Sequence, residues 1–276
     1  MYDIAQLHNT LLVGDDGDDQ ALMVHPGGIH ALEQFVLAKH YLTTQIYQNK
    51  VRLIADNMLV RAIRLGVEVD KIRFLRDLYI YQDSSGYIEN YIQWDDRRVL
   101  TELLKPEYER KHAGELFRRL VSRKLLKRVF TIKLRELPSP APEKLAEEFP
   151  KARRSLEDQI AEELKRLHKG KAPKVNSHFV VLNQFNIESV RTQSRNSEGS
   201  IMILKGRQPI PLEQESTLFR SIDESLKESH LECYAPVEYQ DERQKRDITN
   251  RMQEFITGLL GKTLVPARAK TGAKRR

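Results

Sequence analysis

The sequence predicts a mainly α fold followed by a small α+β lobe. Apolar residues recur at steps of three and four through most of the first 130 residues, which is the spacing of amphipathic helices. A segment at 136–145 with three prolines then interrupts the helical pattern. Beyond residue 175, short runs typical of β-strands alternate with helical segments, as in a sheet with helices packed on it.

The chain opens with a short predicted helix at 2–9, followed by a hairpin. Two apolar runs, 11–13 and 21–24, flank the polar segment GDDGDDQ, which is typical of a turn. A long helix is predicted from Ile29 to Leu65, because no proline or glycine interrupts that range. The residues expected on its buried face are Val51, Ile54, Met58, Ala62 and Leu65.

Shorter helices are predicted to complete the first half. Gly66 follows the last apolar step, where a glycine commonly ends a helix. Apolar steps of three and four predict helices at about 70–82, 95–104 and 112–127. The proline-rich segment 136–145 is predicted to be a linker, because proline cannot occupy a helix interior without strain.

The second half is expected to contain both kinds of element. Its predicted helices are 143–168, 214–228 and 239–260, and its predicted strands are 179–182, 201–204 and 231–234. These elements suggest four segments. They are a helical domain with the hairpin at 1–136, a linker and charged helix at 137–175, an α+β lobe at 176–261 and a basic tail at 262–276.

Composition excludes several classes of protein. The sequence has no run of about 18 apolar residues, so a transmembrane helix and a membrane partner are not expected. The first residues do not resemble a signal peptide, and a cytoplasmic location is expected. The single cysteine, Cys233, excludes an intramolecular disulfide and a cysteine-cluster zinc site.

The net charge of +7 belongs to the end of the chain. The last fifteen residues carry six of the 46 basic residues and no acid, which leaves 40 basic against 39 acidic residues upstream. Such a tail is either a solvated appendage or an arm that binds nucleic acid. The basic helical segment 118–128 has the same two interpretations.

One helix face collects polar side chains that suit a nucleotide. Lys39, Thr43, Tyr47 and Lys50 follow one another at steps of four, four and three, with Gln48 beside Tyr47. Ammonium groups satisfy phosphates, and a phenol suits a sugar or base. A solvated helix face with extended lysines explains the same spacing, so periodicity alone leaves both interpretations open.

Motifs for self-contained catalysis are absent from the sequence. None of the eight histidines is followed by aspartate, and there is no His-Glu-x-x-His pair, Walker loop, G-x-G-x-x-G or G-x-S-x-G. The sequence therefore predicts neither a catalytic residue nor a metal ligand within this chain.

The elements in this order resemble the HD-superfamily phosphohydrolases, in particular the deoxynucleoside triphosphate triphosphohydrolase branch. The similarity covers nearly all of residues 2–260 and is most specific at ALEQFVLAKHYLTTQIYQNKVRLIADNMLVRAI (31–63). That segment is similar to the family's long helix with its Tyr-x-x-Lys sequence, here Tyr47 to Lys50. The opening YDIAQLHNTLLV, Trp94-Asp95-Asp96 and the Arg123-x-Leu-Leu-Lys127 segment fit the same pattern.

The resemblance implies a fold and a chemistry. The first half would be the C-terminal part of an HD-domain helical core. The family's His…His-Asp…Asp set binds a divalent metal (Mg, Mn, Fe or Zn), and the enzyme releases deoxynucleoside and triphosphate. This set lies upstream of the family's equivalent of Tyr2, so the metal is expected for the complete family enzyme and no cofactor is expected in this chain.

The resemblance also assigns roles to individual residues. Lys39 stands where the family often has an arginine that contacts substrate phosphate, and Tyr47 and Gln48 match residues that face sugar and base. Lys50 and Arg123 match cations that contact an effector nucleotide or its phosphates. The expected partners are a nucleotide of the deoxynucleoside triphosphate type and either a second copy of the chain or an upstream HD segment.

These expectations leave three functions. The first is the C-terminal part of a nucleotide phosphohydrolase, which hydrolyses only when the upstream metal-binding segment completes it. The second is a catalytically inactive module that binds nucleotide or forms oligomers. The third is a nucleic-acid-binding protein that uses the basic tail and the segment 118–128.

Overall fold

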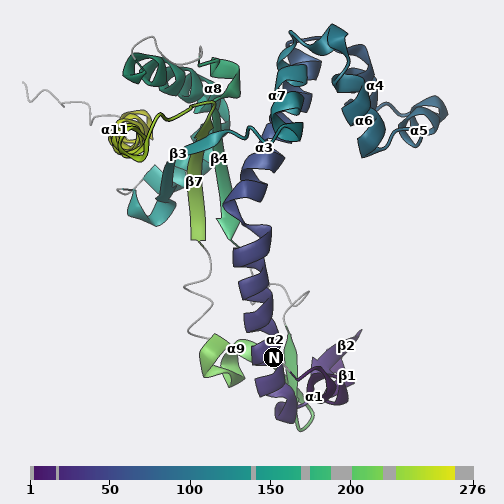
Figure 1. Cartoon of the computed structure of the whole chain (residues 1–276). Helices are drawn as coiled ribbons and strands as arrows, with labels where there is room; N and C mark the ends of the chain where they lie inside the picture. Colours follow the sequence, from purple (N-terminus) through teal and green to yellow (C-terminus); the bar gives the residue numbers. More distant parts are fainter. Residues whose placement is uncertain are drawn as a thin grey trace, which may run out of the picture. The chain divides into compact units, whose positions relative to one another are not determined.

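The computed structural model describes residues 3–16, 19–137, 141–168, 175–187, 201–219 and 228–264 (Figure 1). The chain forms two units, each built from two separate segments. The first unit comprises Met1–Asn49 and Phe185–Ser229, and the second comprises Lys50–Gln184 and His230–Arg276. Most of the described residues are helical and the strands form two small sheets, which confirms the predicted fold class.

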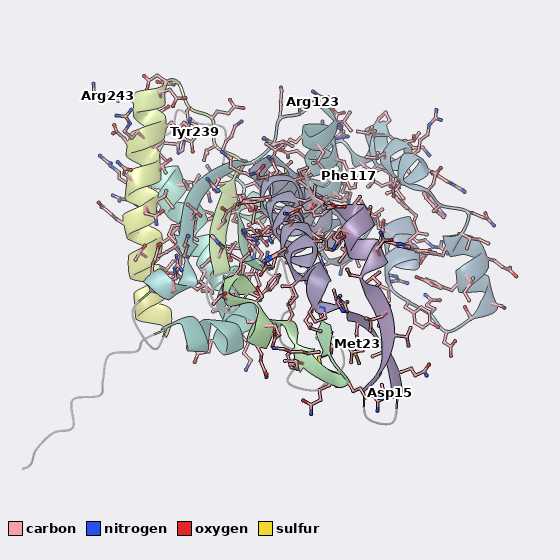
Figure 2. All side chains as sticks on the ribbon, turned by 90° about the horizontal axis from the view of Figure 1, so that it is seen from below. Asp15, Met23, Phe117, Arg123, Tyr239 and Arg243 are labelled. Atoms are coloured by element: carbon pink, nitrogen blue, oxygen red, sulfur yellow. The ribbon has the colours of Figure 1, made fainter. Side chains whose placement is uncertain are left out.

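The first unit begins with the predicted helix and hairpin. α1 (Ile4–Asn9) starts after Asp3, whose side chain accepts a hydrogen bond from the backbone N–H of Gln6 at 2.9 Å. β1 (Leu11–Asp16) pairs antiparallel with β2 (Asp19–Val24), and Figure 2 labels Asp15 near the tip of this hairpin. Both predicted elements are confirmed.

Two later strands complete the sheet of the first unit. β5 (Met202–Lys205) pairs parallel with β2, and β6 (Gln208–Pro211) pairs antiparallel with β5, so the strand order is β1-β2-β5-β6. α9 (Leu212–Glu215) follows β6 directly. The buried apolar core of this unit is small and consists of Val24, Leu32, Val36, Ile203, Leu212 and Phe219.

The predicted long helix is interrupted. η1 (Pro26–Gly28) leads into α2 (Ile29–Leu42), a π-helical segment η2 (Thr43–Tyr47) follows, and α3 (Lys50–Glu68) begins after Asn49. The prediction of one unbroken helix is therefore wrong.

Local hydrogen bonds explain this break. The backbone N–H of Gln48 donates to the carbonyl of Thr43 at 2.9 Å, which is one residue further back than in an α-helix. The hydroxyl of Thr44 donates to the carbonyl of His40 at 3.0 Å, and such a side-chain bond competes with the backbone ladder. Apolar spacing carries no information about these bonds, so the pattern could not indicate the break.

α3 packs with its apolar face inward, with two differences from the prediction. Ile54, Met58, Ala62 and Leu65 are buried as expected, whereas Val51 is exposed. Gly66 does not end the helix, because α3 continues to Glu68. A Cβ at Gly66 would lie 2.3 Å from Cδ1 of Leu75 and 3.2 Å from Cβ of Ala113, so this glycine permits close packing of neighbouring helices.

Four further helices follow α3 in the second unit. They are α4 (Arg73–Tyr79), α5 (Ser85–Tyr91), α6 (Asp96–Leu103) and α7 (His112–Val121), with η3 (Pro106–Tyr108) between the last two. Of these helices, α4 and α7 contact α3. The predictions at 70–82 and 95–104 are confirmed, α5 was not predicted, and the helix predicted at 112–127 ends at Val121. Side chains start three of these helices: Ser84 caps α5, Asp95 caps α6, and Asp70 accepts from the backbone N–H of Ala113 in α7 at 2.8 Å.

The second unit also contains a three-stranded sheet in the order β3-β7-β4. β3 (Lys127–Lys133) pairs antiparallel with β7 (Glu228–Ala235), and β4 (Val181–Ile187) lies on the other side of β7. η4 (Leu134–Glu136) and η5 (Ser177–Phe179) adjoin this sheet in the sequence. α8 (Ala141–Leu167) and α11 (Glu242–Leu264) confirm the predicted helices at 143–168 and 239–260. The linker predicted at 136–145 is wrong from residue 141 onward, because Pro142 lies in the first turn of α8, where a backbone N–H needs no partner within the helix.

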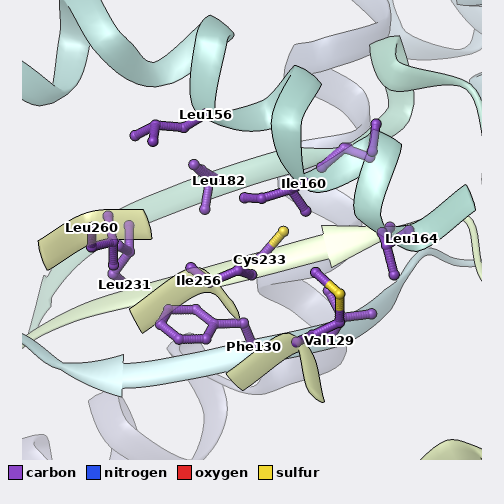
Figure 3. Packing of buried hydrophobic residues seen from close by; sticks show 14 of the residues in the cluster. Val129, Phe130, Leu156, Ile160, Leu164, Leu182, Leu231, Cys233, Ile256 and Leu260 are labelled. Carbon is purple, nitrogen blue, oxygen red and sulfur yellow. The ribbon is translucent and has the colours of Figure 1, made fainter. Parts of the chain in front are cut away.

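Alternate residues along the strands belong to two different cores. Leu182, Leu231 and Cys233 pack with side chains of α8 and α11, as Figure 3 shows. Val181 and Tyr234, one position along, pack with α3 and α7. Side chains of a strand alternate between the two faces, so one face of the sheet meets α8 and α11 while the other meets the helical core.

The boundaries of the two units differ from the four segments suggested by the sequence. β3 lies within 1–136 yet pairs with β7 of the later lobe. β5 of that lobe pairs with β2 of the N-terminal hairpin, and β6 joins the same sheet through β5. The lobe is therefore not a separate sheet, because its strands complete two sheets begun earlier in the chain. Most of the helix predicted at 214–228 and residues 265–276 of the basic tail lie outside the described residues. No helix in the described part of the chain is long and apolar enough to cross a membrane.

Candidate functional site

Four of the predicted site residues lie on α2, η2 and the turn that follows. Lys39 is exposed on α2, Tyr47 is 51% exposed at the end of η2, and Thr43 and Gln48 are partly buried. The wider turn of η2 changes the angular spacing that a regular α-helix would give. The four residues therefore share one segment, which we call the polar segment (Lys39–Gln48), without forming the straight stripe predicted from a continuous helix.

Lys50 belongs to the other unit. It is the first residue of α3, and the boundary between the units falls between Asn49 and Lys50. The predicted stripe is therefore divided at this boundary. Its cation at position 50 is exposed at the start of a helix in the second unit.

Gln48 has a side-chain amide that is only half satisfied. Its Nε2 donates to the backbone carbonyl of Asn186 at 3.4 Å. Its Oε1 is buried and has no hydrogen-bond partner among the described residues. A buried carbonyl oxygen without a donor costs free energy, and an amino or hydroxyl group of a ligand would supply that donor.

Arg123 lies at the C-terminus of α7, exposed at the surface (Figure 2). Its backbone N–H donates to the carbonyl of Leu120 at 3.1 Å, and that of Lys124 donates to the carbonyl of Arg119 at 2.8 Å. This pair of bonds is a Schellman motif, which places Arg123 at the left-handed position that glycine usually occupies. Its φ of 56° is accordingly in the region that favours glycine.

The described residues do not fit a metal site or a cysteine nucleophile. They contain no group of three or more His, Cys, Asp or Glu side chains that could hold a metal ion. The divalent metal remains an expectation for the complete family enzyme. Cys233 is fully buried, and its burial raises the pKa of the thiol far above the usual range, which keeps it protonated and unreactive.

A cluster of arginines in the second unit was not predicted. Arg61 is 7% exposed on the buried face of α3 and forms an ion pair with Glu157 of α8, which is 1% exposed. The Nε of Arg153 lies 3.1 Å from Oε1 of Glu157, and the Nη1 of Arg154 lies 3.8 Å from Oε2. Arg64 lines one cavity together with Arg61, Arg153 and Arg154. We call Arg61, Arg64, Arg153 and Arg154 the arginine cluster.

The sequence does contain a signal for this cluster. Arg61 follows Met58 by three residues and precedes Leu65 by four, so it interrupts the apolar face of α3 with a charge. A charge on a buried face requires a partner of opposite sign. Glu157, four residues after Arg153 and one after the buried Leu156, has the position to supply it, but only the fold shows that α3 and α8 meet.

Comparison with known proteins identifies the family. The chain belongs to the family described as the HD associated region, whose sequence profile matches residues 13–253. No curated protein matches the chain. The family match supports the relationship to the HD superfamily that the sequence suggested.

Two solved structures share the fold. One is a hypothetical protein from Aquifex aeolicus, with 20% identity and a TM-score of 0.50 over 92% of this chain and 51% of the other. The other is a phosphohydrolase from Bacteroides thetaiotaomicron, with 20% identity and a TM-score of 0.52 over 84% of this chain and 56% of the other. The chain thus spans about half the length of either structure, and at this identity the similarity concerns the fold alone.

Proposed function

We propose that this chain is the C-terminal part of a metal-dependent phosphohydrolase that acts on deoxynucleoside triphosphates. The observation that carries the proposal is the match of the HD-associated family to residues 13–253. The similarity of fold to a phosphohydrolase from Bacteroides thetaiotaomicron agrees with it. In this proposal the metal and the attacking water are held by a His…His-Asp…Asp segment that is not part of these 276 residues.

The polar segment supplies one wall of the substrate site in this proposal. Lys39 is exposed and offers an ammonium group for a phosphate. Tyr47 presents a half-exposed phenol for sugar or base, and the unpaired Oε1 of Gln48 can accept a hydrogen bond from either. These side chains bind and orient a nucleotide, whereas bond cleavage belongs to the metal-binding segment.

A comparison of two proteins tests this proposal. The DNA upstream of Met1 is searched for a coding segment with His…His-Asp…Asp, and this chain is then purified alone and together with that segment. Release of deoxynucleoside and triphosphate is measured with Mg²⁺ or Mn²⁺. We expect hydrolysis from the completed protein and none from this chain alone, because its sequence has no His-Asp pair.

Two outcomes would contradict the proposal. Robust metal-dependent hydrolysis by the highly purified chain alone would show that catalysis does not need the segment. A completed protein that binds metal but hydrolyses no deoxynucleoside triphosphate would contradict the assigned substrate. Mass spectrometry of each preparation excludes a contaminating enzyme.

Exposed apolar side chains in the second unit favour oligomerisation as a second role. Val60 on α3, Tyr81 between α4 and α5, and Ile92 after α5 are each more than 60% exposed. Contiguous exposed apolar patches commonly mark contact surfaces, and we propose that these side chains belong to one. We expect light scattering to show an oligomer, and a well-behaved monomer with a sharp two-state melt would contradict this role.

A further inference from the structure

We propose that the arginine cluster is a binding site for a phosphoryl group. Three features of the second unit carry this proposal: a buried carboxylate shared among several arginines, a local excess of positive charge, and two cavities lined by the same arginines. The polar segment plays no part in it, and the proposal stands whether or not the chain belongs to a hydrolase.

The shared carboxylate is that of Glu157. Its Oε1 accepts from the Nη2 of Arg61 and from the Nε of Arg153. The backbone N–H of Leu182 donates to the same oxygen at 3.1 Å. Glu157 balances the charge of one arginine, yet the guanidinium groups of Arg61, Arg153 and Arg154 all lie within ion-pair distance of it.

Two further acids near the cluster are paired with arginines at the surface. Glu68, which lines one of the two cavities, pairs with Arg64 at 3.5 Å, and both side chains are mostly exposed. Asp158 pairs with Arg154 at 3.0 Å, again at the surface. Exposed pairs are screened by water and do little to balance buried charge.

A further acid, Asp56, lines one of the cavities but has its own partner. It pairs with Arg52 at 3.4 Å, and both side chains are about half exposed. The interior of the cluster therefore depends mainly on Glu157 for negative charge.

The crowding of like charges is visible at Arg61. Burial lowers the pKa of its guanidinium, and Glu157 opposes that shift. The positive charges of Arg153 and Arg154 lower the same pKa further. If the ion pair with Glu157 served only to bury Arg61, these neighbours would be unfavourable, because their positive charges repel its guanidinium. A bound anion would relieve this repulsion.

Two cavities open beside the cluster. The first has a volume of about 230 Å³, and its polar lining includes Arg154 and His178. The second has a volume of about 360 Å³, and its polar lining includes Asn57 and Asn183. Arg61, Arg64 and Arg153 line both cavities. Pockets for small ligands begin at roughly 300 Å³, so the adjoining cavities provide room for a phosphoryl group and an attached moiety.

The available donors suit a phosphoryl group. Each guanidinium has five N–H donors in a planar fork that matches two phosphate oxygens, and Glu157 accepts from one nitrogen each of Arg61 and Arg153. The Nη2 of Arg154 lies 3.3 Å from the Nδ1 of His178. Because arginine can only donate, that Nδ1 accepts, and the proton of the neutral ring is on Nε2.

The charge state of His178 supports this assignment. Burial lowers the pKa of its imidazole, and the charges of Arg154 and His112 lower it further. The ring is therefore neutral near pH 7, with an N–H donor and no charge of its own to satisfy. His178 lines the first cavity, so it adds a neutral donor beside the arginines.

Titration calorimetry on the full chain tests the proposal. The probes are inorganic phosphate, inorganic tripolyphosphate and a deoxynucleoside triphosphate, which separate a free oxyanion from a nucleotide as the source of the phosphoryl group. The test variants are Arg153→Gln, which removes a fork that lines both cavities, and Arg64→Gln, which is exposed and does not contact Glu157. The control is Arg166→Gln on the same helix α8, where Arg166 pairs with Glu163 and lines neither cavity.

The expected result is loss of affinity in the test variants alone. Each of them should weaken binding of tripolyphosphate by about ten- to a hundredfold, the size of one lost charge-assisted contact, while Arg166→Gln leaves it unchanged. The melting temperature of Arg64→Gln should stay at the wild-type value, which separates loss of binding from loss of folding. Binding of the nucleotide alone, with the same dependence on the two arginines, would also support the site and would identify its ligand as a nucleotide.

Four results would overturn the proposal. Three of them are no binding of any probe at millimolar concentration, an equal loss of affinity in Arg166→Gln, and an affinity that neither Arg64→Gln nor Arg153→Gln changes. Nucleotide binding that depends on Tyr47 and not on the arginines would likewise overturn it. Failure of the hydrolysis assay has no bearing on any of these results, so the two proposals fail separately.

Discussion

The polar segment and the arginine cluster both offer positive charge to a ligand, through one lysine and through four arginines respectively, but they differ in burial. Lys39 and Tyr47 of the polar segment lie at the surface. Arg61 of the cluster is buried and paired with the equally buried Glu157. An exposed cation can be removed with little effect on folding, whereas a buried pair contributes to folding and to any binding at once. Measurements of stability and of affinity should therefore separate the two regions.

The largest effect on stability is expected from Glu157→Ala. This change leaves Arg61 buried without its carboxylate and removes the acceptor of the Leu182 N–H, so the free energy of unfolding should fall by about 3–5 kcal/mol. Urea denaturation followed by circular dichroism gives the value. A loss below about 1 kcal/mol would show that the pair is not as buried as the structure has it.

A smaller loss in the free energy of unfolding is expected from Gly66→Ala. This variant tests the packing of α3, the helix that carries Arg61. The new methyl group would meet Cδ1 of Leu75 at 2.3 Å, and overpacking of this kind costs about 1–3 kcal/mol. Gly86→Ala is the matched control, because Gly86 is also helical and a Cβ there has nothing within 4 Å. We expect the control to be neutral or slightly stabilising in thermal melts, and equal losses in both variants would contradict the packing of α3 against α4.

Arg123→Gly should act in the opposite direction. Arg123 has a φ of 56° at the end of α7, and glycine adopts that conformation without strain, so the free energy of unfolding should rise by up to about 1 kcal/mol. If Arg123 contacts an effector nucleotide, the same change weakens nucleotide binding in calorimetry. A variant that is less stable than the wild type would contradict the helix end described here.

The smallest effects on stability belong to the exposed lysines. Lys39→Ala and Lys50→Ala should change the free energy of unfolding by no more than about 0.5 kcal/mol, since neither side chain is buried. Tyr47→Ala should cost somewhat more, because half of that ring is covered. Thermal melts of the three variants check this order, and a large loss in Lys39→Ala would remove the contrast between the two regions.

Local patterns predicted local elements and did not predict how those elements combine. Apolar spacing identified α4, α6, α8 and α11, and alternation with turn residues identified the hairpin. The same spacing extended the helix predicted at 112–127 beyond Val121, because Leu125 and Leu126 continue the apolar steps after the turn at Arg123 that ends α7. Pairing of strands far apart in the sequence also makes one sheet from the N-terminal hairpin and β5, which no local signal indicates.

The candidate site was predictable only in part, for a related reason. Helical spacing singled out Lys39, Tyr47 and Gln48, and a family resemblance assigned their roles. Neither shows that η2 changes the turn or that Oε1 of Gln48 is unpaired. The arginine cluster needed the meeting of α3 and α8, which are separated by more than 70 residues. Charge within an apolar face marked Arg61 as unusual, but its partner could only be identified from the fold.

The contrast between the polar segment and the arginine cluster is tested most directly by calorimetry. A deoxynucleoside triphosphate is titrated into the protein completed by its metal-binding segment, for the wild type and for Lys39→Ala. Loss of one charge-assisted contact should weaken binding by about 1–3 kcal/mol, while the melting temperature stays the same. That pair of results would show that the polar segment serves the ligand and not the fold. An unchanged affinity in Lys39→Ala, and again in Tyr47→Ala, would contradict the account and leave the segment as a solvated helix surface.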